Sequence, residues 1–175
     1  YQLKYQLKVK SLSEIQKSID DSVLVAEYFL GDSAIYIAAI TKSEFNIYSI
    51  ARDKGFSEMV DGFYTSILKS ENEDFVNGAN NLSGLLINPI KGKIRAKKNI
   101  IVVPHDILFK IPFETLLSEN ASLPITSYAK LDYLVLQNNI RYEYSASLLV
   151  SDKQLSTGKE TSGNFIGFAP VFPGD

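Results

Sequence analysis

The chain contains a single histidine, His105, which is the first residue to consider as a general base. His105 follows Pro104 at the end of an apolar run, and active sites of α/β sheets gather at strand ends. A general base needs a nucleophile or an acid beside it. Asp106 is the obvious neighbour, able either to orient the ring or to cap the turn. We interpret His105 as structural or merely exposed, because a base without a nucleophile is half of a mechanism.

Serine nucleophiles are the next candidates. Ser145 lies between a predicted strand and a predicted helix, where a nucleophile elbow would stand, but the glycines of G-x-S-x-G are absent. A helix N-cap explains Ser145 better, and a serine hydrolase that uses it is kept as an alternative. The S-x-x-K pattern occurs at Ser66 to Lys69 and at Ser156 to Lys159. Neither copy has the companion motifs that give the pattern meaning, so we attribute both to chance.

Composition and motif patterns exclude several other kinds of functional site. Without cysteine, this stretch has no disulfide, no thiolate metal site and no cysteine nucleophile. No cluster of histidine and carboxylates has metal-ligand spacing, and no glycine-rich loop fits a phosphate. We therefore assign no catalytic, cofactor-binding or metal-binding residues and expect no cofactor. Five of the eight residues from Lys91 to Lys98 are basic, but without interleaved aromatic residues we interpret the run as a solvated connector.

The overall composition is that of a globular domain. The 175 residues are 45% hydrophobic and 22% charged, with 18 basic and 20 acidic residues for a net charge of -2. This balance gives no general attraction to nucleic acid or anionic membrane, and no apolar run approaches the roughly 20 residues of a membrane span. We expect a cytoplasmic protein without nucleic-acid or membrane partners. Because it lacks an initiator Met, we also expect the chain to begin inside a longer protein.

A short helix and three β-rich runs are predicted first. Ser11 and Glu14 form a capping-box pattern, which predicts a helix over Leu12 to Ile19. Short turn-forming segments then join the predicted strands, which is typical of an antiparallel meander. These strands are Val23 to Leu30, Ala34 to Thr41 and Phe45 to Ala51.

The middle of the chain changes to a helical period. Apolar residues from Phe56 to Leu68 recur at i, i+3, i+4 and i+7, which predicts an amphipathic helix. A second helix is predicted after Ser70, and Pro89 helps to stop it. Its apolar stripe consists of Phe75, Ala79, Leu82 and Leu86.

The last third alternates predicted strands and helices. Ile100 to Val103 is apolar and β-branched, which indicates a central strand buried on both faces. Further strands are predicted at Ile140 to Tyr144 and Phe165 to Phe168, with a helix at Ser145 to Val150 and a loop at Gln154 to Gly163. The predicted class is an α/β layered domain, in which an antiparallel meander leads into a mostly parallel sheet flanked by helices. We expect that sheet to be incomplete where the chain stops.

The most specific pattern lies between Asn99 and Leu117. A buried strand ends at Pro104, a tight turn follows, and Ile111-Pro112-Phe113-Glu114 is predicted to open a helix with Pro112 in its first turn. This order closely resembles the CHAT domain, a caspase-like domain usually found beside tetratricopeptide repeats. Three weaker matches agree: Leu24 to Asp32, the Tyr-x-x-Ser-x-Ser pattern of Tyr142 to Leu148, and Phe165 to Pro170.

The resemblance implies a partial caspase-like domain, with residues 1–10 as a tail or linker and 11–175 as its N-terminal portion. The family is similar to caspases and separases, which cleave peptide bonds with a His–Cys dyad, and both dyad residues would follow the end of this chain. His105 matches the turn before Pro-Phe-Glu instead. The chain would be the non-catalytic part of a candidate cysteine endopeptidase. Its implied partners are the catalytic half and upstream tetratricopeptide repeats, with dimerisation through an exposed sheet edge as a further expectation. The alternative is a stand-alone protein-interaction module without enzymatic activity.

Overall fold

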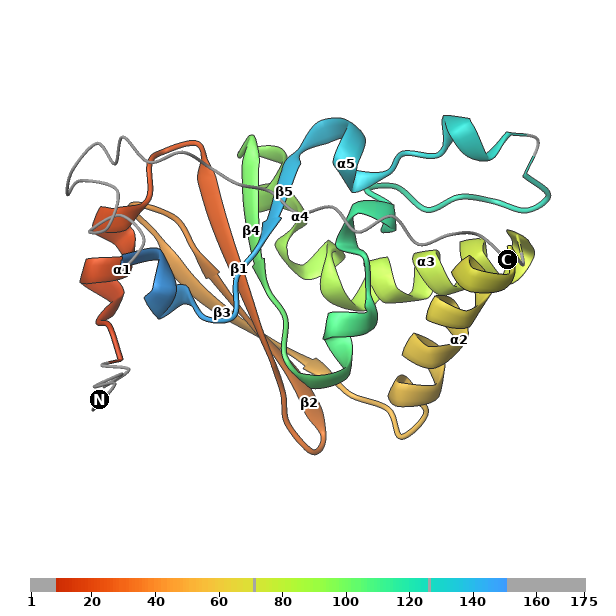
Figure 1. Cartoon of the computed structure of the whole chain (residues 1–175), viewed down its shortest axis with the longest axis horizontal. Coiled ribbons are helices and arrows are strands. Elements are labelled where there is room, and N and C mark those ends of the chain that lie inside the picture. The colour runs from red at the N-terminus through yellow and green to blue at the C-terminus, as the bar shows by residue number, and fades with distance from the viewer. Residues whose placement is uncertain (1–8, 71, 126, 151–175) are drawn as a thin grey trace, which may run out of the picture.

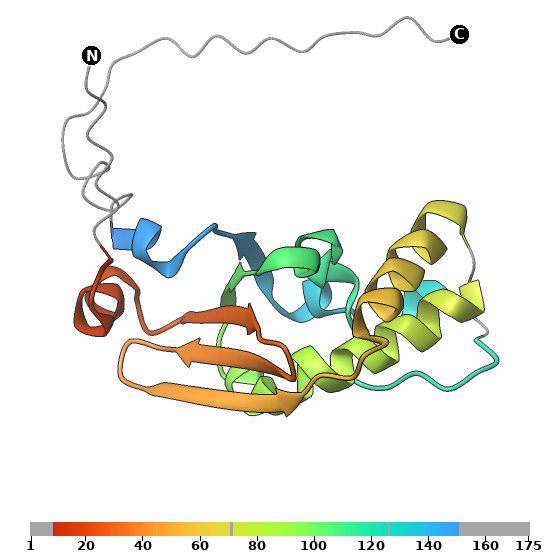
Figure 2. The same ribbon diagram turned by 90° about the horizontal axis from the view of Figure 1, so that it is seen from below.

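A computed structural model describes residues 9–70, 72–125 and 127–150 of the chain. These residues form one mixed sheet with helices on both of its faces (Figures 1 and 2). Its five strands lie in the order β3-β2-β1-β4-β5. They are β1 (Val23–Leu30), β2 (Ala34–Ile40), β3 (Phe45–Ala51), β4 (Asn99–Val103) and β5 (Asn139–Tyr142). The predicted α/β class is confirmed.

The sheet is antiparallel on one side of β1 and parallel on the other, as the sequence predicts. β1 pairs antiparallel with β2, and β2 with β3, whereas β4 pairs parallel with both β1 and β5. β4 is buried on both faces, because Ile100 and Val102 enter one apolar cluster and Ile101 and Val103 enter another. β5 ends at Tyr142, two residues earlier than predicted.

The first face of the sheet, which carries Leu24, Ala26 and Tyr28 of β1, holds the larger core. Two helices cover it, α2 (Phe56–Lys69) and α3 (Asn72–Leu86) (Figure 1). Both were predicted from their apolar spacing, which puts one stripe of each helix against the strands. The two helices pack closely at Gly78, where an added Cβ would lie 2.9 Å from Cδ2 of Phe63.

The second face carries Val23, Val25, Glu27 and Phe29 of β1, and among the described residues only one half of it is covered. The cover consists of α1 (Leu12–Ser18) and a short helix at 146–150. The predicted capping box of α1 is formed: the Glu14 N–H donates to Ser11 Oγ at 3.3 Å, and the Ser11 N–H donates to the Glu14 carboxylate at 2.9 Å. Within the described residues, no helix covers the half that contains Glu27 and Phe29, which we call the open half.

Two local predictions are wrong. Residues Lys91–Arg95, predicted as a connector, form the short helix α4 after a 3-10 turn at Asn88–Ile90, because Ile94 anchors the segment in the core. The helix predicted to open at Pro112 is a single 3-10 turn, Phe113–Thr115.

Contacts with distant segments explain why the helix predicted to begin at Pro112 does not form. The Leu117 N–H donates to Ser83 Oγ at 2.8 Å, and the Leu116 carbonyl accepts from the Leu134 N–H at 2.9 Å. These bonds replace helical ones, so tertiary context overrides local propensity here. A further helix, α5 (Leu134–Gln137), then leads into β5. The strand predicted at Phe165–Phe168 and the loop predicted at Gln154–Gly163 lie outside the described residues.

Candidate functional site

The carboxyl ends of β1, β4 and β5 meet at one edge of the sheet, because these three strands are parallel. Ligands of open α/β sheets bind at that edge. Two hollows open there, and Tyr144 lines both. We call them the histidine hollow, about 380 Å³ and lined in part by Phe29 and His105, and the motif hollow, about 580 Å³ and lined in part by Glu114 and Tyr142.

His105 joins the end of β4 to the end of β1. Its Nδ1 accepts a hydrogen bond from the Leu30 N–H at 3.2 Å, and its ring centroid lies 4.7 Å from that of Phe29. A neutral imidazole that accepts at Nδ1 carries its proton on Nε2. Asp106 begins a 3-10 helix with a left-handed φ of 54°, and no hydrogen bond between described residues links it to the ring. This geometry agrees with a structural role for His105 and a turn role for Asp106.

The serines do not join His105. Ser145 caps the helix at 146–150, since its Oγ accepts from the Ser147 N–H at 3.2 Å and its carbonyl accepts from the Leu148 N–H at 3.0 Å. The N-cap prediction for Ser145 is therefore confirmed. Ser66 is buried inside α2 and donates its hydroxyl to the Phe63 carbonyl at 2.7 Å. The other S-x-x-K copy, at Ser156, lies outside the described residues.

The motif hollow contains a hydrogen-bonded pair that we call the clasp, Glu114 and Tyr142. The Tyr142 hydroxyl donates to Glu114 Oε2 at 2.5 Å and accepts from the Phe113 N–H at 2.8 Å. Burial raises the pKa of Tyr142, and the hydrogen bond to Glu114 raises it further, so the phenol stays protonated.

The clasp rests on an aromatic core. Phe113 is fully buried, with its ring centroid 5.2 Å from that of Tyr28 and 6.3 Å from that of Tyr142. The Tyr28 hydroxyl donates to the Leu86 carbonyl at 3.0 Å, and burial raises the pKa of Tyr28 strongly. The Pro-Phe-Glu and Tyr-x-x-Ser stretches, 28 residues apart along the chain, thus meet in space. Sequence reasoning singled out both stretches, but nothing in either indicated that they bind each other.

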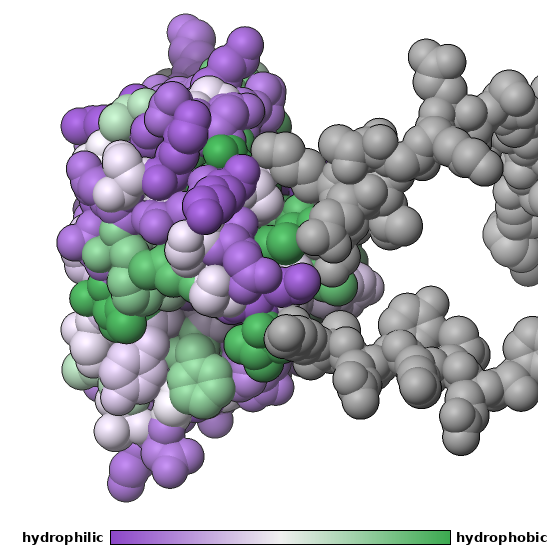
Figure 3. Space-filling model, turned by 90° about the vertical axis from the view of Figure 1, so that its left-hand side faces the viewer, coloured by the Kyte–Doolittle hydropathy of each residue, from purple (hydrophilic) through white to green (hydrophobic). Residues whose placement is uncertain are grey.

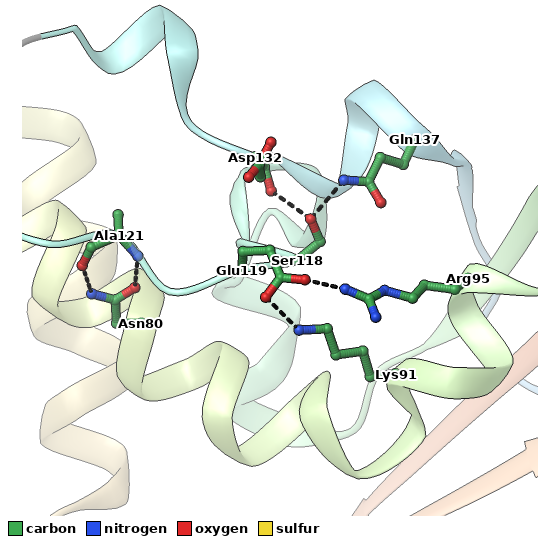
Figure 4. A network of polar contacts seen from close by, with 8 residues as sticks. All are labelled: Asn80, Lys91, Arg95, Ser118, Glu119, Ala121, Asp132 and Gln137. Atoms are coloured by element: carbon green, nitrogen blue, oxygen red, sulfur yellow. Dashed lines mark hydrogen bonds and ion pairs between the residues drawn. The ribbon is translucent and has the colours of Figure 1, made fainter.

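The basic run is engaged within the domain (Figure 4). Lys91 Nζ lies 2.8 Å from a Glu119 carboxylate oxygen, and Arg95 pairs with the other oxygen. Lys93 pairs in the same way with Glu44. The hydrogen bond from Lys91 is the main reason that the pKa of Glu119 is lowered. The run thus ties α4 to neighbouring segments.

The segment that bears Glu119 is also held by neutral hydrogen bonds (Figure 4). The Asn80 amide bonds both the carbonyl and the N–H of Ala121, at 2.8 and 3.0 Å. The Ser118 hydroxyl donates to the Asp132 carbonyl at 3.0 Å and accepts from the Gln137 amide at 2.7 Å. These bonds position the long connection between β4 and β5 over the end of α3.

The described residues contain neither a metal-binding group nor a membrane-spanning helix. Within residues 9–70, 72–125 and 127–150, no three His, Asp or Glu side chains form a group that could hold a metal ion. In the same part of the chain, no helix is both long and apolar enough to cross a membrane.

The molecule is thus an α/β domain in which His105 and the clasp connect the carboxyl ends of β1, β4 and β5 to neighbouring segments. Comparison with protein families matches the CHAT domain to residues 77–170, or 94 of the 175 residues. The matched range contains His105 and both partners of the clasp. The chain belongs to the CHAT domain family, as its sequence resemblance predicted. No match was found among curated proteins.

Proposed function

We propose that this chain is the non-catalytic N-terminal portion of a CHAT-family cysteine endopeptidase with a caspase-like fold. Residues 1–10 would be a tail or linker from an upstream region, and residues 11–175 would support a catalytic half and dock upstream tetratricopeptide repeats. The observation that carries the proposal is the clasp, in which the polar groups of the family's two motif stretches bind one another.

Three polar residues at the carboxyl edge, Glu114, His105 and Ser145, each have a structural partner. Glu114 accepts from Tyr142, His105 accepts from the Leu30 N–H, and Ser145 caps a helix. Hydrolysis by nucleophilic catalysis needs a nucleophile within hydrogen-bond reach of a base. Among the described residues of this edge, Ser145 and His105 form no such pair, and in the Tyr142–Glu114 pair the pKa of the phenol is raised, which opposes its use as a nucleophile. This arrangement supports a scaffold that holds three strand ends in register.

A stand-alone protein-interaction module is the second candidate, and one observation favours it. The histidine hollow exposes large apolar side chains, with Phe29 55% and Tyr144 81% exposed. Exposed apolar patches of this kind mark interaction surfaces. This module would have a caspase-like fold and no peptidase partner.

Hydrolysis assays on the whole 175-residue chain test the non-catalytic role. We expect no cleavage of casein and no labelling by a fluorophosphonate probe. His105→Asn and His105→Ala separate the two roles of the histidine, because the Asn side-chain oxygen can accept from the Leu30 N–H but cannot act as a base. A structural role predicts a lower Tm for His105→Ala and a smaller change for His105→Asn. Hydrolysis that both variants abolish would overturn the proposal.

Reconstitution distinguishes the scaffold from the module. The polypeptide encoded after Asp175 would be produced separately and mixed with this chain before sizing chromatography. Co-elution is expected for a scaffold, and Tyr142→Phe should weaken it because it loosens the end of β5. Separate elution of the two polypeptides would contradict the scaffold and leave the interaction module.

A further inference from the structure

The motif hollow has aromatic walls. Four of its nine lining residues carry rings, which come from α2, from the 3-10 helix at Asp106–Lys110 and from the chain at the end of β5. They are Tyr64, Phe109, Tyr142 and Tyr144. Their exposed fractions run from 38% to 81%, and the ring centroids of Phe109 and Tyr144 lie 5.9 Å apart. Within the described residues, ring surface is therefore accessible to a ligand in this hollow.

The charges around the hollow leave one carboxylate without a cation. The charged lining residues are Lys110, Glu114 and Glu143. Lys110 Nζ lies 2.6 Å from an Asp61 carboxylate oxygen, and Glu143 is compensated in the same way by Arg141 at 2.7 Å. Among the described residues, no Lys, Arg or His forms an ion pair with Glu114. The described part of the hollow thus combines ring surface with one uncompensated negative charge.

The clasp holds that carboxylate in place. The Tyr142 hydroxyl donates to Glu114 Oε2 at 2.5 Å and so fixes where the charge lies. A carboxylate has about four lone-pair sites on its two oxygens, so further donors can bind Glu114 while Tyr142 stays bound. A group that is positioned before binding loses less conformational entropy when a ligand arrives. Glu114 is therefore a preorganised acceptor at the wall of the hollow.

We propose that the motif hollow binds an arginine side chain of a polypeptide partner, with the guanidinium group on Glu114 and its plane against the rings of Phe109 and Tyr144. Cations are attracted to the faces of aromatic rings, and arginine combines this contact with a planar fork of donors that matches a carboxylate. The volume of about 580 Å³ is that of an ordinary ligand pocket and admits the side chain with its neighbouring backbone. The inference uses the lining of this hollow alone and does not depend on the proposed function.

Other ligand classes fit the hollow less well. An acidic side chain would be repelled by Glu114, and a neutral apolar one would bury the carboxylate without a partner. A lysine ammonium could pair with Glu114, but it is a strongly hydrated point charge without a planar face to lie on a ring. Within the described residues, no group of three His, Asp or Glu side chains could hold a metal ion there.

The neighbouring histidine hollow provides an internal comparison. It also contains a carboxylate, Glu27, which is half-buried like Glu114. Among the described residues no hydrogen bond holds the Glu27 side chain, and the His105 Nε2–H adds a donor that opposes a cation. This hollow lies on the open half, and Figure 3 shows hydrophobic side chains gathered in the lower part of that side of the molecule, bordered by polar ones. We therefore expect an arginine side chain to prefer the motif hollow.

Titration of the whole isotope-labelled chain with the peptide acetyl-Ala-Arg-Ala-amide tests the site. We expect saturable shifts of the amide signals of Phe109, Glu114 and Tyr144. The matched peptide with citrulline in place of arginine has the same shape without the charge. It should bind about tenfold more weakly, which is the effect of losing a charged hydrogen bond. The matched lysine peptide should also bind more weakly than the arginine peptide.

Three variants locate the bound side chain. Glu114→Gln keeps an acceptor for Tyr142 but removes the charge, so it should weaken binding of the arginine peptide about tenfold. Phe109→Leu removes an exposed ring without disturbing the clasp, and it should weaken binding about two- to fivefold, the size of an exposed cation–π contact. Glu27→Gln is the matched control, because it removes the same charge from the other hollow, and it should leave the affinity unchanged.

Four results would overturn the proposal. One is the absence of saturable shifts with the arginine peptide. Another is equal affinity for the arginine and citrulline peptides, which would make the binding apolar. Equal affinity for the lysine peptide would mean that the planar group is not recognised. The last is equal weakening by Glu27→Gln and Glu114→Gln, which would trace the binding to net charge or to the histidine hollow.

Discussion

The two faces of the same sheet are covered to different extents, and the comparison separates what folds the domain from what it can bind. On the first face, α2, α3 and the connection between β4 and β5 bury a continuous core. On the second face, α1 and the helix at 146–150 cover only the half nearest the start of β1. Both faces of β1 carry mostly apolar residues, with Glu27 as the exception on the second face, so the sequence of β1 alone does not show that one face is less covered. The first face holds the larger buried core, whereas the open half leaves Phe29 and Ile47 exposed.

The largest expected effect compares one phenylalanine from each face. Phe113→Ala removes a fully buried ring and should lower the free energy of unfolding by about 3–5 kcal/mol. Phe29→Ala, at a ring that is 55% exposed, should cost about 1 kcal/mol or less. Urea unfolding of both variants measures the difference. Equal losses would break the comparison, since they would mean that the open half is covered as tightly as the first face.

Regular periodicity explains which elements the sequence predicts well. β1, β3 and α2 have long uniform patterns, and their bounds agree with prediction to within a residue. α4 was missed because a single apolar residue, Ile94, stands among basic ones. The turn at Phe113–Thr115 was predicted as a helix because no local signal shows that Ser83 and Leu134 draw its backbone away.

The candidate site was predicted in part. The family resemblance rests on Pro112-Phe113-Glu114 and on the stretch that begins at Tyr142, and the motif hollow is lined by Pro112, Glu114, Tyr142 and Tyr144 of these stretches. Their contact could not be predicted, because it depends on how the long connection folds over the first face. The open half was also missed, since apolar residues on both faces of β1 predict burial on both.

The second prediction concerns the helices that cover the first face. Gly78→Ala would place a methyl group 2.9 Å from Cδ2 of Phe63 and 3.1 Å from its Cβ. Overpacking of this kind costs about 1–3 kcal/mol, more than the helix propensity gained. Gly84→Ala, in the same helix with nothing within 4 Å of the added atom, should instead stabilise by about 0.5–1 kcal/mol. Thermal unfolding should shift in opposite directions, and two shifts of the same sign would argue against close packing at Gly78.

The third prediction tests the clasp, which closes the first face at β5. Tyr142→Phe removes the donor to Glu114 and leaves the Phe113 N–H without its acceptor, so the free energy of unfolding should fall by about 1 kcal/mol. Glu114→Gln keeps an acceptor and should cost less. A double-mutant cycle measures the coupling between the two residues. Additive losses would show that the clasp contributes no interaction of its own.

The smallest effect is expected at Glu119, where the connection over the first face is held by charge. Lys91 and Arg95 lower the pKa of Glu119, so its contribution to stability is present above the pKa of the unfolded state and is lost as pH falls through the folded value. Glu119→Gln should therefore lower Tm slightly at pH 7 and flatten the loss of Tm on acidification. Added salt should reduce the difference in Tm between Glu119→Gln and wild type, because exposed ion pairs are screened. Asp32→Asn, in the exposed turn after β1, is the control. If it flattens the acid profile equally, the effect comes from net charge and not from the Lys91–Glu119–Arg95 network.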